Sequence, residues 1–190
     1  MLTDRKQQIY LKRIGLYDGK IDGKKGPKHK AGILALQKKY MPESEWDGEC
    51  GAKTDIVLVN AYRVAKYTKN FKLEEFKCKC NGRYCTGYPA YLNIQMLKNL
   101  QSLRNEFGPI IVTSGLRCVK YNNKMPGSSK TSKHLKGKAL DIAILPLTNT
   151  EKGRKKVMAY FKKLPAFNYT YCNIDGNYPN MGNAVHIDVK

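Results

Sequence analysis

Apolar residues recur along this chain with two different periods. Spacings of three and four residues predict helices over residues 4–16, 28–40 and 54–66. The same spacing predicts helices over residues 90–107 and 150–164. The first third of the chain is therefore expected to be helical, and the remainder to mix helices with strands.

Two short segments alternate with the period of a strand. Residues 139–144 place Leu140 and its apolar partners on one side and Asp141 on the other. Residues 185–189 place valine and isoleucine on one side, and His186 and Asp188 on the other. Ile110–Gly115 reads as a further, buried strand. The alternation predicts two strands that present His and Asp groups on their polar faces.

His134, Asp141 and His186 supply two imidazoles and one carboxylate. Catalytic zinc sites commonly use three protein ligands and leave a fourth position for water. A glycine lies between His134 and Asp141, and their spacing is not helical. A histidine on a strand is more often structural or solvated, so spacing alone leaves both interpretations open.

A ten-residue pattern and a later His-x-Asp segment resemble the zinc D-Ala-D-Ala carboxypeptidase and L-alanyl-D-glutamate endopeptidase family, which includes many bacteriophage endolysins. They are Ser132-Lys-His134-Leu-Lys-Gly137-Lys-Ala139-Leu-Asp141 and Val185-His186-Ile187-Asp188-Val189. The resemblance spans about residues 71–190. It implies an α+β zinc peptidase with a small, mainly antiparallel sheet over residues 67–190, holding one Zn²⁺ through His134, Asp141 and His186.

The resemblance also implies roles for residues around the metal. Arg117, in Ser114-Gly-Leu-Arg, matches a family motif whose arginine holds the substrate carbonyl or the oxyanion; the alternative is an ordinary surface salt bridge. Ser132 is expected to orient a ligand or the substrate. Several members of this wider family carry an acid three residues before the last histidine, where this chain has Asn183.

The general base is therefore open. Asp188 projects to the same strand face as His186, and is either the base or a partner that fixes a ligand ring; we favour the second role. Asp175 is a weaker candidate for the base.

The first 66 residues carry a second pattern, with no internal repeat that we can find. The pattern resembles the common three-helix peptidoglycan-binding domain and runs Gln8…Leu11-x3-Gly15-x-Tyr17-x-Gly19-x2-Asp22-Gly23-x2-Gly26-Pro27. It implies an all-α three-helix bundle over residues 1–66, and we expect binding at the 17–26 loop. The alternative is that Asp22-Gly23 is merely a turn and that this unit stabilises its neighbour.

Lysine and arginine number 35 against 15 acidic residues, a formal charge of +20. Such a charge indicates a polyanionic partner, which could be nucleic acid, an anionic membrane surface or a cell wall. The lysines are spread over both units without an RNA motif or zinc finger, so we do not expect a specific nucleic acid. Together with the two resemblances, the charge implies peptidoglycan and anionic wall polymers as partners. We expect a monomer.

No apolar run approaches 18 residues, and the amino terminus has no secretory pattern. Membrane insertion is therefore not expected. We expect synthesis in the cytoplasm and action at the bacterial wall after release.

Six cysteines leave the redox state undetermined. Cys78-x-Cys80-x4-Cys85 could be half of a structural zinc site, a disulfide cluster or reduced thiols, and reduced thiols are the default without a secretory signal. Because C-x-C is not the usual C-x2-C knuckle, we expect no second, structural ion there.

These patterns together predict a peptidoglycan hydrolase of endolysin type that cleaves a peptide bond with zinc-activated water. The sequence does not name the bond. One alternative is a non-catalytic wall-binding protein that keeps the peptidase fold, with Asn183 as its mark. Another is a basic nucleic-acid-binding protein.

Overall fold

The computed structural model describes residues 1–175 and 179–190, with the backbone alone at Asp175 and Pro179. Its helices are α1 (Asp4–Arg13), α2 (Pro27–Tyr40), α3 (Ala52–Tyr67), α4 (Ile94–Phe107), α5 (Val119–Asn122) and α6 (Glu151–Phe161). Its strands are β1 (Ile111–Ser114), β2 (Ala139–Ala143), β3 (Phe167–Cys172) and β4 (Val185–Val189). Short 3₁₀ turns are η1 (Glu43–Glu45), η2 (Leu73–Phe76), η3 (Lys133–Lys136), η4 (Leu147–Asn149), η5 (Asn173–Asp175) and η6 (Pro179–Met181).

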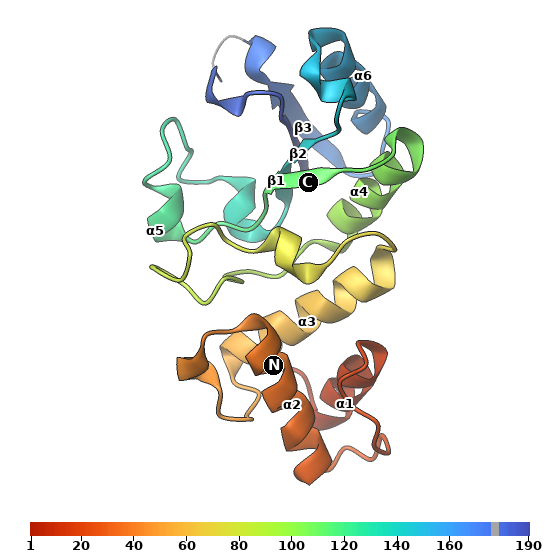
Figure 1. The fold of residues 1–190 in the computed structure, drawn as a ribbon, viewed down its shortest axis with the longest axis vertical. Coiled ribbons are helices and arrows are strands. Elements are labelled where there is room, and N and C mark those ends of the chain that lie inside the picture. The colour runs from red at the N-terminus through yellow and green to blue at the C-terminus, as the bar shows by residue number, and fades with distance from the viewer. Residues whose placement is uncertain (176–178) are drawn as a thin grey trace.

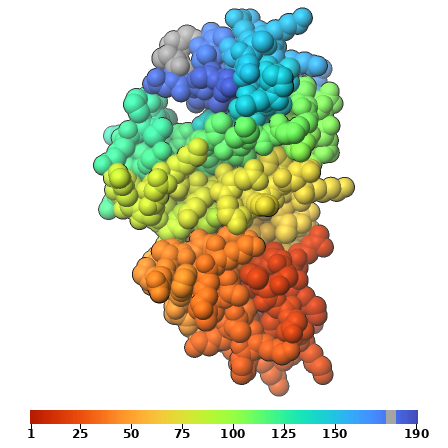
Figure 2. Space-filling model, in the orientation of Figure 1, coloured from red at the N-terminus to blue at the C-terminus, as the bar shows by residue number. Residues whose placement is uncertain are grey.

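The molecule is elongated, with α1 and α2 at one end and the sheet at the other (Figures 1 and 2). The four strands form one antiparallel sheet in the order β1-β2-β4-β3. Helices α4 and α6 contact strand β4, and η3 contacts β2. Among the described helices, none is both long and apolar enough to cross a membrane. The small antiparallel sheet and the α+β class predicted for the second part of the chain are confirmed.

Helices α1 and α6 begin within one residue of their predicted starts, because local sequence supplies a side-chain cap at each. Thr3 accepts a hydrogen bond from the amide of Lys6 at the start of α1, and Thr150 does the same for Gly153 in α6. Helix α4 starts at Ile94 rather than at residue 90, because Asn93 accepts from the amide of Met96 and so caps it there.

Strands β2 and β4 are buried on both faces, which the alternation did not predict. All five residues of each strand are buried, including Asp141, His186 and Asp188. One reason is that the apolar side packs into the main hydrophobic cluster, while η3, which contacts β2, brings His134 onto the polar side. The histidine and aspartate face is therefore an interior wall rather than an open surface.

Two loops in the helical first third share one hydrogen-bond arrangement. Gln8 donates to Asp22 Oδ1 at 2.8 Å and accepts from the amide of Gly23 at 2.8 Å. Gln37 donates to Asp47 Oδ1 at 2.7 Å and accepts from the amide of Gly48 at 2.8 Å. Each loop leads into the next helix, so a buried glutamine fixes each helix entry.

Helix α3 lies between the two ends of the molecule and packs against α1, α2 and α4 (Figure 1). Asn60 is fully buried; its amide donates to the carbonyl of Ala90 at 2.9 Å and accepts from the amide of Leu92 at 2.8 Å. Arg63 Nη1 donates to the carbonyl of Leu92 at 2.7 Å, and Tyr91 donates to Asp55.

The main hydrophobic cluster extends from Leu11 to Val189. The division into units at 1–66 and 67–190 stays a prediction, since α3 packs against helices of both proposed units.

We predict that Asn60→Ala destabilises the whole chain. The substitution strips buried groups of their partners, and each such group costs about 1–3 kcal/mol. Gln101→Ala is the matched control, because its hydrogen bonds to Lys69 and Asn70 are exposed and water can replace them. Urea unfolding followed by circular dichroism measures both variants. Equal midpoints for the two variants would contradict the role given to Asn60.

Candidate metal centre

The pairing of β2 with β4 builds the centre of the site. Asp141 lies directly opposite His186 in the antiparallel register, so both side chains stand on the same face of the sheet. His134 reaches this face from η3, which ends at Gly137 with a φ of 63°. A side chain at Gly137 would overlap the carbonyl oxygen of Tyr91 as well as strain the left-handed backbone, so the turn requires glycine.

His134, Asp141 and His186 bring three ligand atoms together, all within 4.8 Å of one another. Asp141 Oδ1 lies 3.3 Å from His134 Nε2 and 2.7 Å from His186 Nδ1. The three residues are only 2%, 5% and 5% exposed, respectively. Two imidazole nitrogens and a carboxylate oxygen are a ligand set that suits zinc.

The second nitrogen of each histidine is held by an acceptor. His134 Nδ1 donates to the carbonyl of Gly115 at 2.7 Å, and His186 Nε2 donates to Asp188 Oδ2 at 3.3 Å. Hydrogen bonds of this kind fix the tautomer and leave the opposite nitrogen free to ligate. His134 Nε2 is buried and makes no hydrogen bond within the described residues. A metal ion would satisfy this atom, so the residues present fit the ion.

Burial and mutual contact shift the pKa values of these three side chains. Burial lowers the pKa of His134, because it disfavours the charged imidazole. Burial also disfavours ionisation of Asp141, but contacts with His134 and His186 outweigh it and hold the pKa of this carboxyl well below its usual range. For His186, hydrogen bonds to Asp141 and Asp188 outweigh burial and raise the pKa. The carboxylate and the neutral His134 are the forms that a cation binds.

Arg117 lies beside the ligands rather than on the open surface. Its Nη2 donates to Asp141 Oδ2 at 2.6 Å, and its Nε donates to Ser114 Oγ at 3.1 Å. The Arg117 side chain is 14% exposed. Oδ1 of Asp141 thus faces the two histidines and Oδ2 faces the guanidinium, so the one carboxylate contacts all three side chains.

Of the other residues predicted for the site, only Asp188 contacts one of the three candidate ligands among the interactions described. Asp188 is buried, with one oxygen bound by His186 and the other accepting from Asn168 at 2.6 Å. Ser132 precedes η3, and its side chain makes no capping hydrogen bond. Asn183 is exposed and donates to Asn149. The side chain of Asp175 lies outside the described residues.

Sequence reasoning missed three residues of the site. Gly115 acts through its backbone carbonyl, which residue identity does not reveal. Tyr171 stacks on His186 with ring centroids 4.4 Å apart, and Asn168 bonds to Asp188. Both lie on β3, where an irregularity between Phe167 and Tyr169 shifts the register against β4. Only the strand pairing could have placed them there.

A family model described as Peptidase M15 matches residues 69–188, which contain all three candidate ligands and the elements that carry them. The chain therefore belongs to the peptidase M15 family. Members of this family are zinc-dependent metallopeptidases, and membership indicates peptidoglycan hydrolysis in general. A search of curated proteins gave no match.

We predict that Asp188→Asn weakens metal binding by roughly 10- to 100-fold, because the histidine loses its carboxylate partner. Competition with a chromogenic chelator measures the affinity. Asp18→Asn, at an exposed acid that pairs with Lys28, is the control and should leave the affinity unchanged. If Asp188 were instead the general base, affinity would be preserved and hydrolysis would stay low even in excess zinc.

Proposed function

We propose that this protein is a zinc-dependent peptidase that cleaves a peptide bond in the stem peptide or cross-link of peptidoglycan. The observation that carries the proposal is the convergence of His134 Nε2, Asp141 Oδ1 and His186 Nδ1, with the remaining nitrogens anchored. Family membership supports the reaction class.

The residues around the three ligands have different roles in this reaction. Zinc, when bound, supplies a Lewis acid for the scissile carbonyl and lowers the pKa of its water towards 7. Asp188 and Gly115 keep the two imidazoles in the ligating tautomer. Arg117 places a positive charge beside the cluster, where it stabilises the negative charge that develops on the carbonyl oxygen. Ser132, next to η3, orients the substrate.

An endopeptidase acting as a lysin is the form of this activity that we favour. Cutting within the stem peptide or cross-link weakens a wall, whereas trimming a terminal D-Ala does not. The charge of +20 favours contact with the phosphate- and carboxylate-rich polymers of bacterial walls. The protein would act at the wall after release from the cell that makes it.

Wall attachment has a candidate place among the N-terminal helices. A cavity of about 130 Å³ lies there, lined by Gln7, Lys25, His29, Lys30, Ile33, Gly48, Glu49 and Cys50. Gln7 Oε1 and His29 Nε2 are buried without hydrogen-bond partners in the described structure. Burial lowers the pKa of His29, so its neutral ring can pair with a sugar hydroxyl or an acetamido group. Holding the enzyme on an immobile polymer raises the local concentration of cleavable bonds.

We predict that the wild-type protein releases new amino termini from purified peptidoglycan, whereas His134→Ala and chelated protein release none. Loss of one of three ligands or of the ion removes the Lewis acid. Mass spectrometry of the soluble fragments identifies the bond. Asp18→Asn is again the control and should digest normally.

Absence of new termini from any sample, with the protein still sedimenting with walls, would overturn the enzymatic proposal in favour of a wall-binding protein. Salt-sensitive binding to random DNA without wall binding would favour a nucleic-acid-binding protein instead.

We further predict that Lys25→Ala/Lys30→Ala lowers cosedimentation with purified walls more than Lys6→Ala/Lys152→Ala. Both double variants lose the same charge from exposed lysines, but only the first pair lines the cavity. Binding curves at fixed ionic strength compare them. An equal loss in both would mean that bulk charge, and not this cavity, holds the wall.

A further inference from the structure

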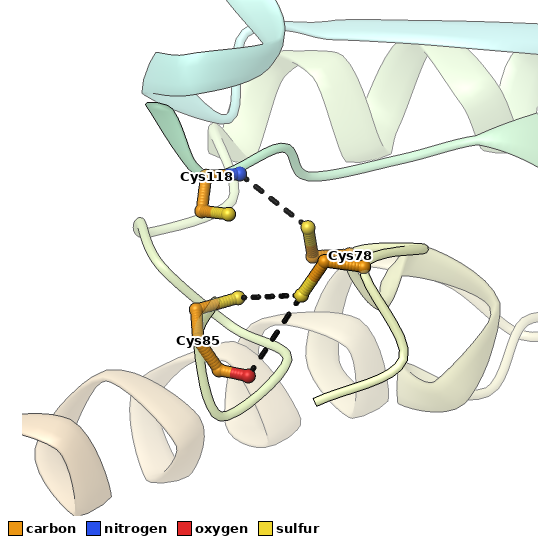
Figure 3. A group of neighbouring side chains, drawn as sticks. Cys78, Cys85 and Cys118 are labelled. Carbon is orange, nitrogen blue, oxygen red and sulfur yellow. Dashed lines mark hydrogen bonds between the residues drawn. The ribbon is translucent and has the colours of Figure 1, made fainter. Parts of the chain in front are cut away.

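Four of the six cysteines meet at one point, away from the peptidase ligands. Cys78, Cys80 and Cys85 belong to the segment between η2 and α4, and Cys118 immediately precedes α5. Their sulfur atoms all lie within 4.8 Å of one another. Figure 3 shows the side chains of Cys78 and Cys85, from this segment, and of Cys118, from a distant part of the chain, close to one another. Cys50 and Cys172 are not members of the group.

The spacing of the sulfurs suits a metal ion. Four thiolates on a tetrahedral zinc, with Zn–S near 2.3 Å, stand about 3.8 Å apart. Cys80 Sγ and Cys85 Sγ are 3.5 Å apart, and all four cysteines are free thiols. A cluster of four sulfurs at this separation needs little movement to close around an ion.

The cluster is also the centre of residues 77–87, the part of its segment that lies outside the main hydrophobic cluster. Residues 77–93 contain no helix or strand, and loops of this length without regular structure are uncommon in compact proteins. Cys78, Cys80 and Cys118 are 2%, 3% and 8% exposed and form a small cluster separate from the main hydrophobic one. Apart from the thiols, only Tyr84 and Tyr121 pack there among the described hydrophobic residues. So little apolar surface contributes little stability, and small folds of this kind commonly rely on a metal or disulfides.

The backbone around the cluster supplies a hydrogen bond to one sulfur and a turn that brings two of the cysteines together. The amide of Cys118 donates to Cys78 Sγ at 3.4 Å, the type of hydrogen bond that supports a ligating sulfur. Asn81 and Gly82, both with positive φ, turn the chain back so that Cys85 can reach Cys80.

We propose that Cys78, Cys80, Cys85 and Cys118 hold a second, structural zinc ion. Four protein ligands close the coordination shell, so this ion stabilises the fold and performs no hydrolysis. The expectation of no ion here rested on three cysteines and the C-x-C spacing; the fourth ligand comes from 33 residues further along the chain. Lys77, Lys79 and Arg83 lie in the same segment and offset the net negative charge of a zinc with four thiolates.

The position of Cys118 connects this ion to the peptidase site. Cys118 follows Arg117, whose amide donates to the carbonyl of His134 and whose side chain holds Asp141. An ion bound by Cys118 therefore fixes the chain one residue from the guanidinium. The structural ion secures the 77–93 segment against the backbone that positions Arg117.

The experiment counts zinc per chain in full-length protein purified under reducing conditions, by elemental mass spectrometry. We expect two ions in the wild type, one in Cys85→Ser and one in His134→Ala. Cys85 is the most exposed of the four cysteines, so its replacement disturbs folding least. Cys50→Ser is the control, since this half-buried cysteine lies outside the cluster, and it should keep both ions. Equal zinc content in Cys85→Ser and wild type would overturn the proposal.

Cobalt substitution of the wild type provides a readout that needs no variant. Only a sulfur-ligated cobalt gives thiolate-to-metal charge-transfer absorption in the near ultraviolet, and the peptidase ligands contain no sulfur. We expect this absorption in cobalt-loaded wild type and in His134→Ala. Its absence from the loaded wild type, or native mass spectrometry showing two disulfides, would rule out the four-thiolate site.

Discussion

The register between β2 and β4 is the constraint on which the peptidase site depends. Antiparallel pairing places Asp141 opposite His186, and side chains alternate between the two faces of each strand. A slip of one residue would turn Asp141 to the opposite face of the sheet and separate it from His186. The apolar residues between the ligands, such as Leu140 and Ile187, lock the register because they must face the hydrophobic cluster. The packing of the core thus determines where the ligands stand.

Burial of these charged groups makes their partners indispensable. A carboxylate taken out of water is costly unless opposite charge or hydrogen bonds compensate it. Asp141 is compensated by Arg117 and the two histidines, and Asp188 by His186 and Asn168. The same dry surroundings strengthen electrostatic interactions with a substrate. The interior wall formed by the two strands is therefore suited to hold both an ion and a developing negative charge.

The proposed structural ion and the proposed wall-binding cavity involve the rest of the chain. The cysteine cluster would hold a segment that lacks regular structure against the backbone at Arg117. Helix α3, through Asn60, joins the helices that line the cavity to the part that carries the sheet. A wall-bound amino-terminal end would consequently present the peptidase ligands from a connected body rather than from a loosely tethered one.

The sequence by itself determined most of the helices, the small sheet and the family, because capping, amphipathic spacing and the His134 to Asp141 pattern are local. It also predicted that His134, His186 and Arg117 belong to the site, and the structure brings them together around Asp141. Only the tertiary structure decided that Gly115 and Asn168 support the cluster, and that Cys118 joins the other three cysteines. These contacts depend on strand pairing and loop paths between residues far apart in the chain, which leave no periodic signal in the sequence.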